Sequence, residues 1–531
     1  MANADVHAPE FKASSLTIGT LIVSAGFIIG KATGFFREMV IAYEFGASEQ
    51  TDAYLIAFIV PILLHNLVAG GALDMAFMPV FARYLVQDRL DEAWRLMSTL
   101  LNLILMILTP LTVLGIIFAP FMASVLGYGL EPETKVLAGK LLNVTMVVLV
   151  LNGALSLFIA ILNSLHFFWS VSLLSTILNV TIISFTIILG PQIGILATAL
   201  GFAVGSGIQV AVQLPALRRL RVKYYPVLSL KHPGIRMVRT LFFPCIIGSA
   251  VSQVNVLVDR VMASPLPPGS IAALNFADSI IGFFNSFGMA FAIVAFPTLN
   301  ELAAGRNYPS MVEMLSVVFR LSAFLLVPVA ILLIVMPQPI VATFYQRGSF
   351  DAGATKATAQ ALTFFALGLP WALSSSLLFR TFYALSDAIT PLKAGLAMIL
   401  LKVLLNWLLR GPLGHGGIAL STSLVYASSV LGLMAVLRVR LGHLDSRRIL
   451  GSGARILLSA LGMGGTALGL REAMSKISNF NALTSVALTV TIAFLSYIGW
   501  TALLKVKELS LLLNLIARKR SRFEVDGDKR G

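Results

Sequence analysis

Ionisable side chains lie inside segments of the chain that are otherwise apolar enough to cross a membrane. Lys31 and Arg37 fall in the apolar run that begins near residue 16, and Asp52 opens the next run. On insertion scales a charged residue at the centre of a membrane helix costs about 2.5–3.5 kcal/mol, whereas one leucine offsets only about 0.3–0.6 kcal/mol. Charged residues kept at that cost normally face a watery cavity and mark a transport pathway. These residues are therefore the first candidates for function.

The candidate substrate-contacting residues share a polar or charged side chain within a predicted span. They are Lys31, Arg37, Asp52, His65, Arg260 and Asp278. The cationic members favour an anionic ligand, because opposite charges attract strongly where the dielectric constant is low. Asp52 has an alternative role, since Thr51 and Asp52 are residue types that also cap the start of a helix.

Two further sets of residues point to ion coupling and to bending. Asp259, Asn406 and Thr422 offer hard oxygen atoms, which suit Na⁺ or a proton relay. Pro61, Gly70 and Gly71 interrupt the second apolar run and predict a hinge there. The uncharged polar residues of the later runs have a second interpretation, because serine, threonine and small residues also suit ordinary helix packing in membranes.

The sequence carries no signature of catalysis. Residues 26–33 mimic a phosphate-binding loop, but only three residues separate the two glycines and neither Ser nor Thr follows Lys31. The six histidines are too scattered for a metal pair, and the single cysteine, Cys245, excludes an internal disulfide framework. No long loop outside the apolar runs is available for a catalytic domain. We therefore expect no enzyme activity and no cofactor.

Composition and charge placement indicate a protein that crosses the membrane many times. Of 531 residues 57% are hydrophobic and only 12% charged, with a mean hydropathy of +0.89, whereas a soluble domain carries about 25% charged residues. The net charge of +15 gathers in loops on one side, such as residues 218–239. That asymmetry marks the cytoplasmic side, argues against nucleic acid as the partner and places both termini in the cytoplasm.

An internal repeat divides the chain into two halves. Ala76-Phe77-Met78-Pro79 resembles Ala295-Phe296-Pro297, and Leu217-Arg218-Arg219 resembles Leu437-Arg438-Val439-Arg440, at a separation of about 220 residues. Apolar runs of membrane-spanning length number about fourteen. The sequence thus predicts an all-α polytopic membrane protein with two parallel six-helix lobes and the substrate path between them. The predicted parts are the lobes 16–215 and 235–440, two further helices in 448–505, and a basic cytoplasmic tail, 506–531.

Several motifs resemble those of the MurJ/MviN family, over roughly residues 16–440. The family comprises bacterial lipid II flippases within the superfamily of multidrug, oligosaccharidyl-lipid and polysaccharide exporters. The resemblance implies fourteen helices in two lobes, a cationic cavity suited to a pyrophosphate head group, and a lipid-facing groove formed by the last two helices. The motifs are Gly34-Phe35-Phe36-Arg37-Glu38, Thr51-Asp52-Ala53-Tyr54, Leu257-Val258-Asp259-Arg260, Phe276-Ala277-Asp278 and Phe382-Tyr383-Ala384-Leu385-Ser386-Asp387.

The chain departs from the family pattern at several charged positions. Where the family has Pro-Asn-Leu-Leu-Arg-Arg, this chain has Pro61-Ile-Leu-Leu-His65-Asn66. The Ala-Asp-Arg of the eighth span is here Ala277-Asp278-Ser279. These losses leave the fold expectation intact and leave two substrates open, lipid II and another lipid-linked glycan.

The resemblance implies a flippase for a polyprenyl-pyrophosphate-linked sugar, in the first place the peptidoglycan precursor lipid II. It would act as a monomer in the bacterial cytoplasmic (inner) membrane, by alternating access, driven by membrane potential or by a Na⁺ or proton gradient. The alternative is a flippase for an exopolysaccharide or O-antigen precursor. A drug antiporter is disfavoured because a cationic cavity repels cationic drugs, a glycan polymerase lacks a catalytic loop, and a scaffold needs no charges inside the membrane.

Overall fold

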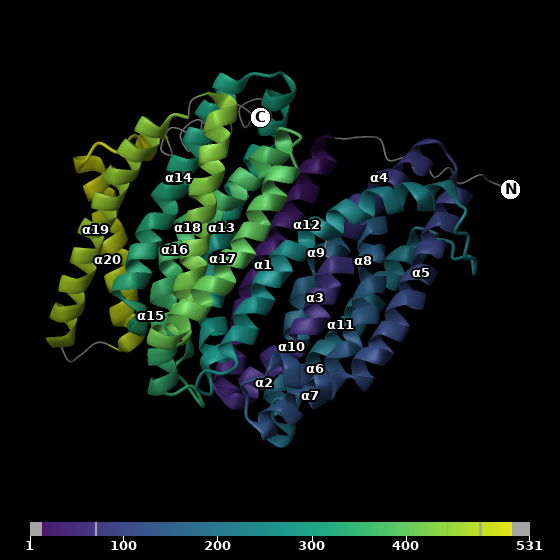
Figure 1. Ribbon diagram of the computed structural model, residues 1–531, viewed down its shortest axis with the longest axis horizontal. Coiled ribbons are helices and arrows are strands. Elements are labelled where there is room, and N and C mark those ends of the chain that lie inside the picture. Colours follow the sequence, from purple (N-terminus) through teal and green to yellow (C-terminus); the bar gives the residue numbers. More distant parts are fainter. Residues whose placement is uncertain (1–12, 69–71, 443, 477–480, 512–531) are drawn as a thin grey trace, which may run out of the picture. The chain divides into compact units, whose positions relative to one another are not determined.

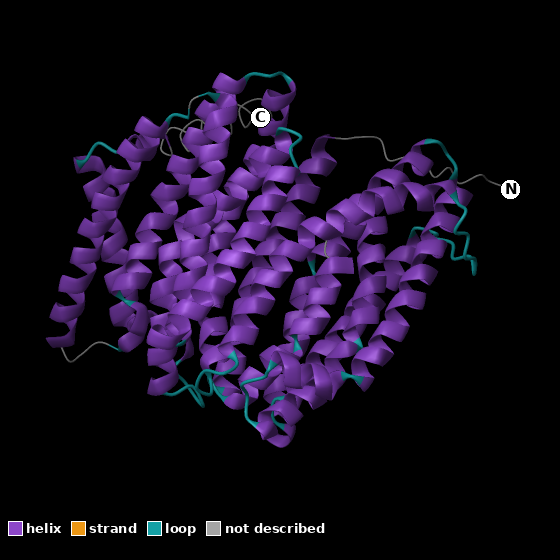
Figure 2. Cartoon of the chain, in the orientation of Figure 1, coloured by secondary structure: helices purple, strands orange, loops and turns teal. Residues whose placement is uncertain are grey.

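The computed structural model describes residues 13–68, 72–442, 444–476 and 481–511, and within these ranges every regular element is a helix (Figures 1 and 2). In this described part, ten helical segments are long and apolar enough to cross a membrane, and Ala76–Val86 is a shorter apolar helix. The all-α polytopic fold is confirmed. The count of about fourteen spans stays a prediction.

The chain forms two compact units, Met1–Pro265 and Leu266–Gly531. Unit 1 contains α1 (Ala13–Phe45), α2 (Glu49–Ala57), α3 (Ile59–Val68), α4 (Ala72–Val86), α5 (Leu90–Ile117), α6 (Ala119–Leu126), α7 (Pro132–Met146), α8 (Val148–Ser164), α9 (Phe168–Ser172), α10 (Leu174–Ile193), α11 (Leu196–Arg219) and α12 (Pro233–Ala263). Unit 2 contains α13 (Ser270–Ala304), α14 (Tyr308–Val335), α15 (Pro337–Tyr345), α16 (Ala352–Ala384), α17 (Ile389–Leu413), α18 (His415–Leu441), α19 (Ser446–Lys476) and α20 (Ala482–Leu503).

The repeat predicted from short sequence motifs also appears in the positions of the helix boundaries. The residue numbers at both ends of α5 and α14 differ by 218 (308 − 90 and 335 − 117). Those of the α7–α8 pair and α16 differ by 220 at both ends (352 − 132 and 384 − 164). Backbone turns with positive φ recur at matching places, His166 with Ser386 and Gly194 with Gly414, each 220 apart (386 − 166 and 414 − 194). The two halves therefore share one backbone plan.

The helix α12 departs from the division drawn from the sequence, which assigned residues 235–440 to the second lobe. It packs along α3 and α4 and lies in unit 1. Asn66 Nδ2 donates to Gln253 Oε1 at 2.9 Å, and the extended segment before α12 is held on α5, where Tyr225 N donates to Ser98 Oγ at 2.9 Å. These polar bonds explain why the first helix after the repeat boundary stays with unit 1.

The predicted hinge of the second span contains a break in the helix. The α2 helix ends at Ala57, and α3 begins at Ile59, two residues before Pro61. Since proline has no N–H, the Ala57 carbonyl loses its helical partner; Thr145 Oγ1 of α7 donates to it instead, at 3.3 Å. Gly70 and Gly71 lie outside the described residues.

The start of the predicted cytoplasmic tail is packed in unit 2. Glu508 is fully buried, and its carboxylate accepts from Arg320 Nη1 of α14 at 2.8 Å and from Ser452 Oγ of α19 at 2.7 Å. Buried charges need such complete pairing to be tolerated. The pair thus ties the end of α20 to α14 and α19. Residues 512–531 lie outside the described part.

Candidate functional site

A stripe of glycines on α1 forms a close contact with α9 and α10. Gly26, Gly30 and Gly34 recur every fourth residue, which places them on one face of the helix. A Cβ added at Gly26 would lie 2.5 Å from Ser172 Cβ, and one at Gly30 would lie 3.0 Å from Ser175 Cβ. Small residues at this spacing let membrane helices approach closely. The segment that mimics a phosphate-binding loop in sequence is therefore a helix-packing surface.

Arg37 continues this face of α1, about one turn beyond Gly34. Its Nη1 donates to Asn179 Oδ1 of α10 at 3.1 Å, and its Nη2 forms an ion pair with Glu38 Oε1 at 2.5 Å. The Arg37 side chain is 28% exposed. The guanidinium is thus held by two protein acceptors and still accessible to a ligand.

Asn179 was not among the residues that the sequence singled out. It is only 6% exposed, and its Nδ2 donates to the Gly30 carbonyl at 3.1 Å and to Thr33 Oγ1 at 3.3 Å. One buried amide therefore fastens α10 to two successive turns of α1. The signal that would have located this contact is the glycine stripe followed by an arginine on the same helix face.

Arg260 on α12 and Tyr54 on α2 complete a polar cluster. Arg260 Nη1 donates to the Leu55 carbonyl beside the α2–α3 break at 2.8 Å. The side chains of Arg37, Glu38 and Arg260 all lie near the buried Tyr54 side chain. We call this set the arginine cluster; its members are Arg37, Glu38, Tyr54, Asn179 and Arg260. Two guanidiniums against one carboxylate give it an excess positive charge, which attracts anions strongly in an apolar surrounding.

Lys31 and His65 lie apart from the arginine cluster. Lys31 lies six positions before Arg37, so the two point about 120° apart on α1 and lie about 9 Å apart along its axis. The exposed Lys31 places its Nζ 5.6 Å from the centre of the Phe27 ring. The His65 Nδ1 is buried and has no hydrogen-bond partner among the described residues. Within the described part of the chain, no hydrogen bond or ion pair joins either side chain to the cluster.

Asp52 is buried in the first turn of α2, with 2% of its surface exposed. The cap of this helix is Ser48, whose Oγ accepts from Thr51 N at 3.5 Å, while Thr51 Oγ1 donates to the Gly46 carbonyl at 2.8 Å. The interpretation of Thr51 and Asp52 as the helix cap is therefore wrong, because Ser48 caps this helix. A carboxylate in the first turn is favoured by the partial positive charge of a helix N-terminus.

The remaining predicted residues are divided between the units. Asp259 lies on α12 of unit 1, whereas Asn406 and Thr422 lie on α17 and α18 of unit 2, so the three form no ion-coupling set within one unit. Lys402 Nζ donates to Thr422 Oγ1 at 2.5 Å, and Ser421 Oγ donates to Asn406 Oδ1. Asp278 is an exposed residue of α13. No group of three His, Cys, Asp or Glu side chains in the described part is placed to hold a metal ion.

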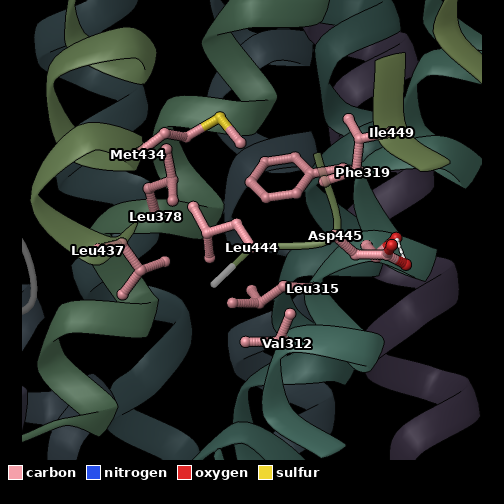
Figure 3. Close-up of a pocket in the computed structure, with 10 residues that line it drawn as sticks. Val312, Leu315, Phe319, Leu378, Met434, Leu437, Leu444, Asp445 and Ile449 are labelled. Atoms are coloured by element: carbon pink, nitrogen blue, oxygen red, sulfur yellow. Dashed lines mark hydrogen bonds between the residues drawn. The ribbon is translucent and has the colours of Figure 1, made fainter. Parts of the chain in front are cut away.

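A small cavity of unit 2 lies between α14, α16, α18 and the start of α19 (Figure 3). Apolar side chains such as Phe319, Leu378 and Met434 line it, with Asp445 at one edge, where Ser316 Oγ donates to its carboxylate at 3.2 Å. An apolar lining with a carboxylate does not suit an anionic head group. The arginine cluster is therefore the better candidate site.

The family described as Lipid II flippase MurJ matches residues 41–488 of this chain. The chain belongs to the MurJ family. The match includes Asp52, His65, Arg260 and Asp278 and begins after Lys31 and Arg37. The family expected from the sequence motifs is thus confirmed.

Individual MurJ proteins match the chain over most of its length. It is 28% identical to the lipid II flippase MurJ of Burkholderia cenocepacia over 429 residues, covering 79% of this chain and 83% of that protein. It is 28% identical to the probable lipid II flippase MurJ of Thermotoga maritima over 496 residues, covering 93% and 98%. A solved MurJ structure, in an inward closed conformation, superposes with a TM-score of 0.77 at 26% identity and covers 91% of this chain and 98% of that one.

The MurJ fold extends to a wider group of transporters. An inward-facing multidrug resistance MATE family transporter of the MOP superfamily matches with a TM-score of 0.66 at 12% identity, covering 80% of this chain and 98% of that one. At that identity the likeness concerns the fold alone. Together with the apolar helices, membership of the MurJ family makes the chain a multi-pass protein of the inner membrane that belongs to a family of transporters.

Proposed function

We propose that this chain is a flippase that moves lipid II from the cytoplasmic to the outer leaflet of the inner membrane. The observation that carries the proposal is the arginine cluster, in which two guanidiniums lie among apolar helices of a MurJ family protein. Guanidinium groups bind phosphate oxygens in a planar, two-pronged geometry and stay charged at all physiological pH values. The pyrophosphate of a polyprenyl-linked sugar carries the complementary charge.

In this mechanism Arg37 and Arg260 donate hydrogen bonds to the phosphate oxygens of the lipid. Asn179 Oδ1, Glu38 and the Leu55 carbonyl hold the two guanidiniums in place. The polyprenyl tail stays in the membrane while the head group crosses by alternating access, and no covalent bond is made or broken. Both termini face the cytoplasm, and one copy of the chain suffices.

We further propose that membrane potential or an ion gradient supplies the drive. Among the oxygen atoms first considered for Na⁺, Thr422 accepts from the Lys402 ammonium. A fixed cation there opposes a second cation at the same oxygen. Asp259 on α12 and Asn406 on α17 are then the remaining candidates for Na⁺ or proton coupling.

A second substrate class is favoured by the departures from the family pattern. His65 and Ser279 stand where the family motifs carry arginine, so this chain carries less positive charge at these positions than the motifs specify. A lipid-linked exopolysaccharide or O-antigen precursor shares the pyrophosphate and differs in the sugar, which makes it the alternative substrate.

Complementation of a bacterium depleted of its own lipid II flippase tests the proposal. The wild-type chain is expected to restore growth, and Arg37→Ala is expected to fail at equal expression. Arg89→Ala is the matched control, because Arg89 is an exposed arginine outside the spans that pairs with Glu92, and it is expected to restore growth. Equal rescue by Arg37→Ala would contradict the role of the cluster. Failure of the well-expressed wild type would favour the other glycan.

A further inference from the structure

We propose that Asn179 of α10 is a positioning residue for anion binding, which sets the orientation of the Arg37 guanidinium. The proposal rests on the proposed function, because Arg37 is taken there to contact the pyrophosphate. Asn179 hydrogen-bonds to α1 and, in this proposal, acts on the ligand only through Arg37. Its carbonyl oxygen is 3.1 Å from Arg37 Nη1.

The partners of Asn179 fix which way its amide points. The Gly30 carbonyl only accepts hydrogen bonds, so the Nδ2 group must face it, at 3.1 Å. The Arg37 guanidinium only donates, so Oδ1 must face Nη1. A flipped amide would place donor against donor and acceptor against acceptor. Only one orientation of the Asn179 amide therefore satisfies the hydrogen-bonding groups of α1.

Helix packing holds the amide in that place. A Cβ added at Gly34 would lie 3.3 Å from Asn179 Nδ2, which shows how closely α1 and α10 approach there. The side chain is 6% exposed. A polar group locked by packing and by three hydrogen bonds offers its acceptor at a fixed point, and a donor held in advance loses less freedom when a ligand binds.

The neutrality of Asn179 also matters for the charge of the site. Arg37 already pairs with Glu38 through Nη2. A second carboxylate at position 179 would cancel the excess positive charge of the arginine cluster, whereas an amide orients the guanidinium and leaves its charge available. One N–H of Nη1 goes to Asn179 and one N–H of Nη2 goes to Glu38. Since Nε is buried, the second N–H of each terminal nitrogen remains for a ligand.

Binding of undecaprenyl pyrophosphate by the full-length chain in nanodiscs tests the proposal. This probe lacks the sugar, so the result does not depend on which glycan is carried. Asn179→Ala is expected to weaken binding about fivefold, the effect of about one hydrogen bond. Asn179→Asp is expected to weaken binding further, because it keeps the size of the side chain and adds a negative charge. If the alanine variant does not fold, the aspartate variant alone carries the test.

Gln209→Ala is the matched control. Gln209 is a buried amide of α11, also 6% exposed, and its Nε2 donates to the Leu174 carbonyl of α10 at 2.8 Å. Gln209→Ala and Asn179→Ala are expected to lower thermal stability similarly, but only Asn179→Ala is expected to weaken binding. In an Arg37→Ala background, Asn179→Ala is expected to have no further effect on affinity.

The outcomes separate this proposal from the proposed function. Binding by the wild type together with unchanged binding by Asn179→Ala would overturn the positioning role and leave the flippase proposal standing. An equal loss of affinity in the Arg37→Ala background, or an equal loss in Gln209→Ala, would also overturn it. If the wild type does not bind the probe, the proposed function fails and the positioning role fails with it.

Discussion

The α10 helix of unit 1 and the α17 helix of unit 2 are counterparts in the repeat, yet their polar residues serve different contacts. Asn179 on α10 faces α1, and its counterpart in the repeat, at an offset of 220, is Ile399. Lys402 on α17 faces α18, and its counterpart at the same offset is Ile182. Lys402 and Ile182 are both almost fully buried, at 3% and 1% exposed. The backbone plan is repeated, and single substitutions on it give each unit its own charge.

The two units also treat their charges differently. In unit 1 the Arg37–Glu38 pair is partly exposed, and Arg37 keeps unused donors. In unit 2 the Lys402 ammonium donates to Thr422. Glu508 is buried in an ion pair with Arg320, which we call a sealed pair because water has little access to it. Accessible charge suits ligand binding, whereas sealed charge suits structure. The contrast therefore supports the proposal that unit 1 binds the anion.

Introducing the unit 2 charge into unit 1 is expected to have the largest effect. Ile182→Lys places an ammonium at a fully buried position without an equivalent of Thr422, whose counterpart in the repeat is Phe202. An unpaired buried charge costs several kcal/mol, so we expect little folded protein by size-exclusion chromatography. Ile182→Met is the control of similar volume and is expected to fold. Normal folding of Ile182→Lys would show that unit 1 has a partner for the charge and that the two helices are interchangeable.

Breaking the sealed pair of unit 2 is expected to cost about 3–5 kcal/mol of unfolding free energy. Glu508→Ala leaves Arg320 buried without its carboxylate. Thermal unfolding in detergent should show a clear decrease in midpoint, and the double variant Arg320→Met with Glu508→Leu should recover most of it. The same truncation in the partly exposed pair, Glu38→Ala, should lower the midpoint less. A larger decrease in midpoint for Glu38→Ala than for Glu508→Ala would contradict the claim that the buried pair of unit 2 contributes more to stability than the partly exposed pair of unit 1.

The smallest expected effect is a pH dependence at the start of α12 in unit 1. His232 Nδ1 accepts from Gly234 N at 3.1 Å and so caps this helix only when the imidazole is neutral. Burial lowers the pKa of His232, and nearby Arg89 and Arg95 act in the same direction against the opposing effect of Glu92. Because the pKa of His232 is lowered in the folded protein, the stability that the cap contributes is complete above about pH 6.5, the pKa of histidine in the unfolded chain. It is lost as the pH falls through the pKa of the folded protein.

Hydrogen exchange of the first turn of α12 at pH 7.5 and 5.0 measures this contribution. We expect protection to fall at the lower pH by an amount equivalent to about 1 kcal/mol, the value of one helix cap. His232→Asn keeps a capping side chain that does not titrate and should remove the pH dependence. His166→Asn is the matched control in the same unit, since His166 contacts the Phe168 ring and caps no helix. Persistence of the effect in His232→Asn would place its origin elsewhere.

Much of the fold followed from the sequence, because hydrophobic length and charge asymmetry are local properties. The membrane class was predicted from these two properties, the internal repeat from recurring short motifs, and the break from the proline at position 61. The unit boundary was not, because the bonds that hold α12 in unit 1, such as Arg260 to Leu55, join residues 205 positions apart. Long-range pairing of this kind leaves no mark in local composition.

The candidate site was predicted less completely than the fold. Arg37 and Arg260 were chosen for their charge, and both belong to the arginine cluster. Asn179 was missed because its partner Arg37 is 142 residues away. Helix periodicity alone would have separated Lys31 from Arg37, since six residues turn an α-helix to a different face. Charge within an apolar segment identifies the candidate functional residues, and the positions of these residues in the fold decide which of them share a site.

The role of the arginine cluster is tested by equilibrium binding of lipid II to the full-length chain in nanodiscs, compared between wild type, Arg37→Gln and Arg89→Gln. Arg37→Gln removes a charge-assisted contact, and we expect binding about 10- to 100-fold weaker than wild type. Arg89→Gln lowers the net charge equally, outside the spans, and should bind as wild type does. Equal affinities in all three proteins would contradict the claim that the arginine cluster of unit 1 holds the pyrophosphate.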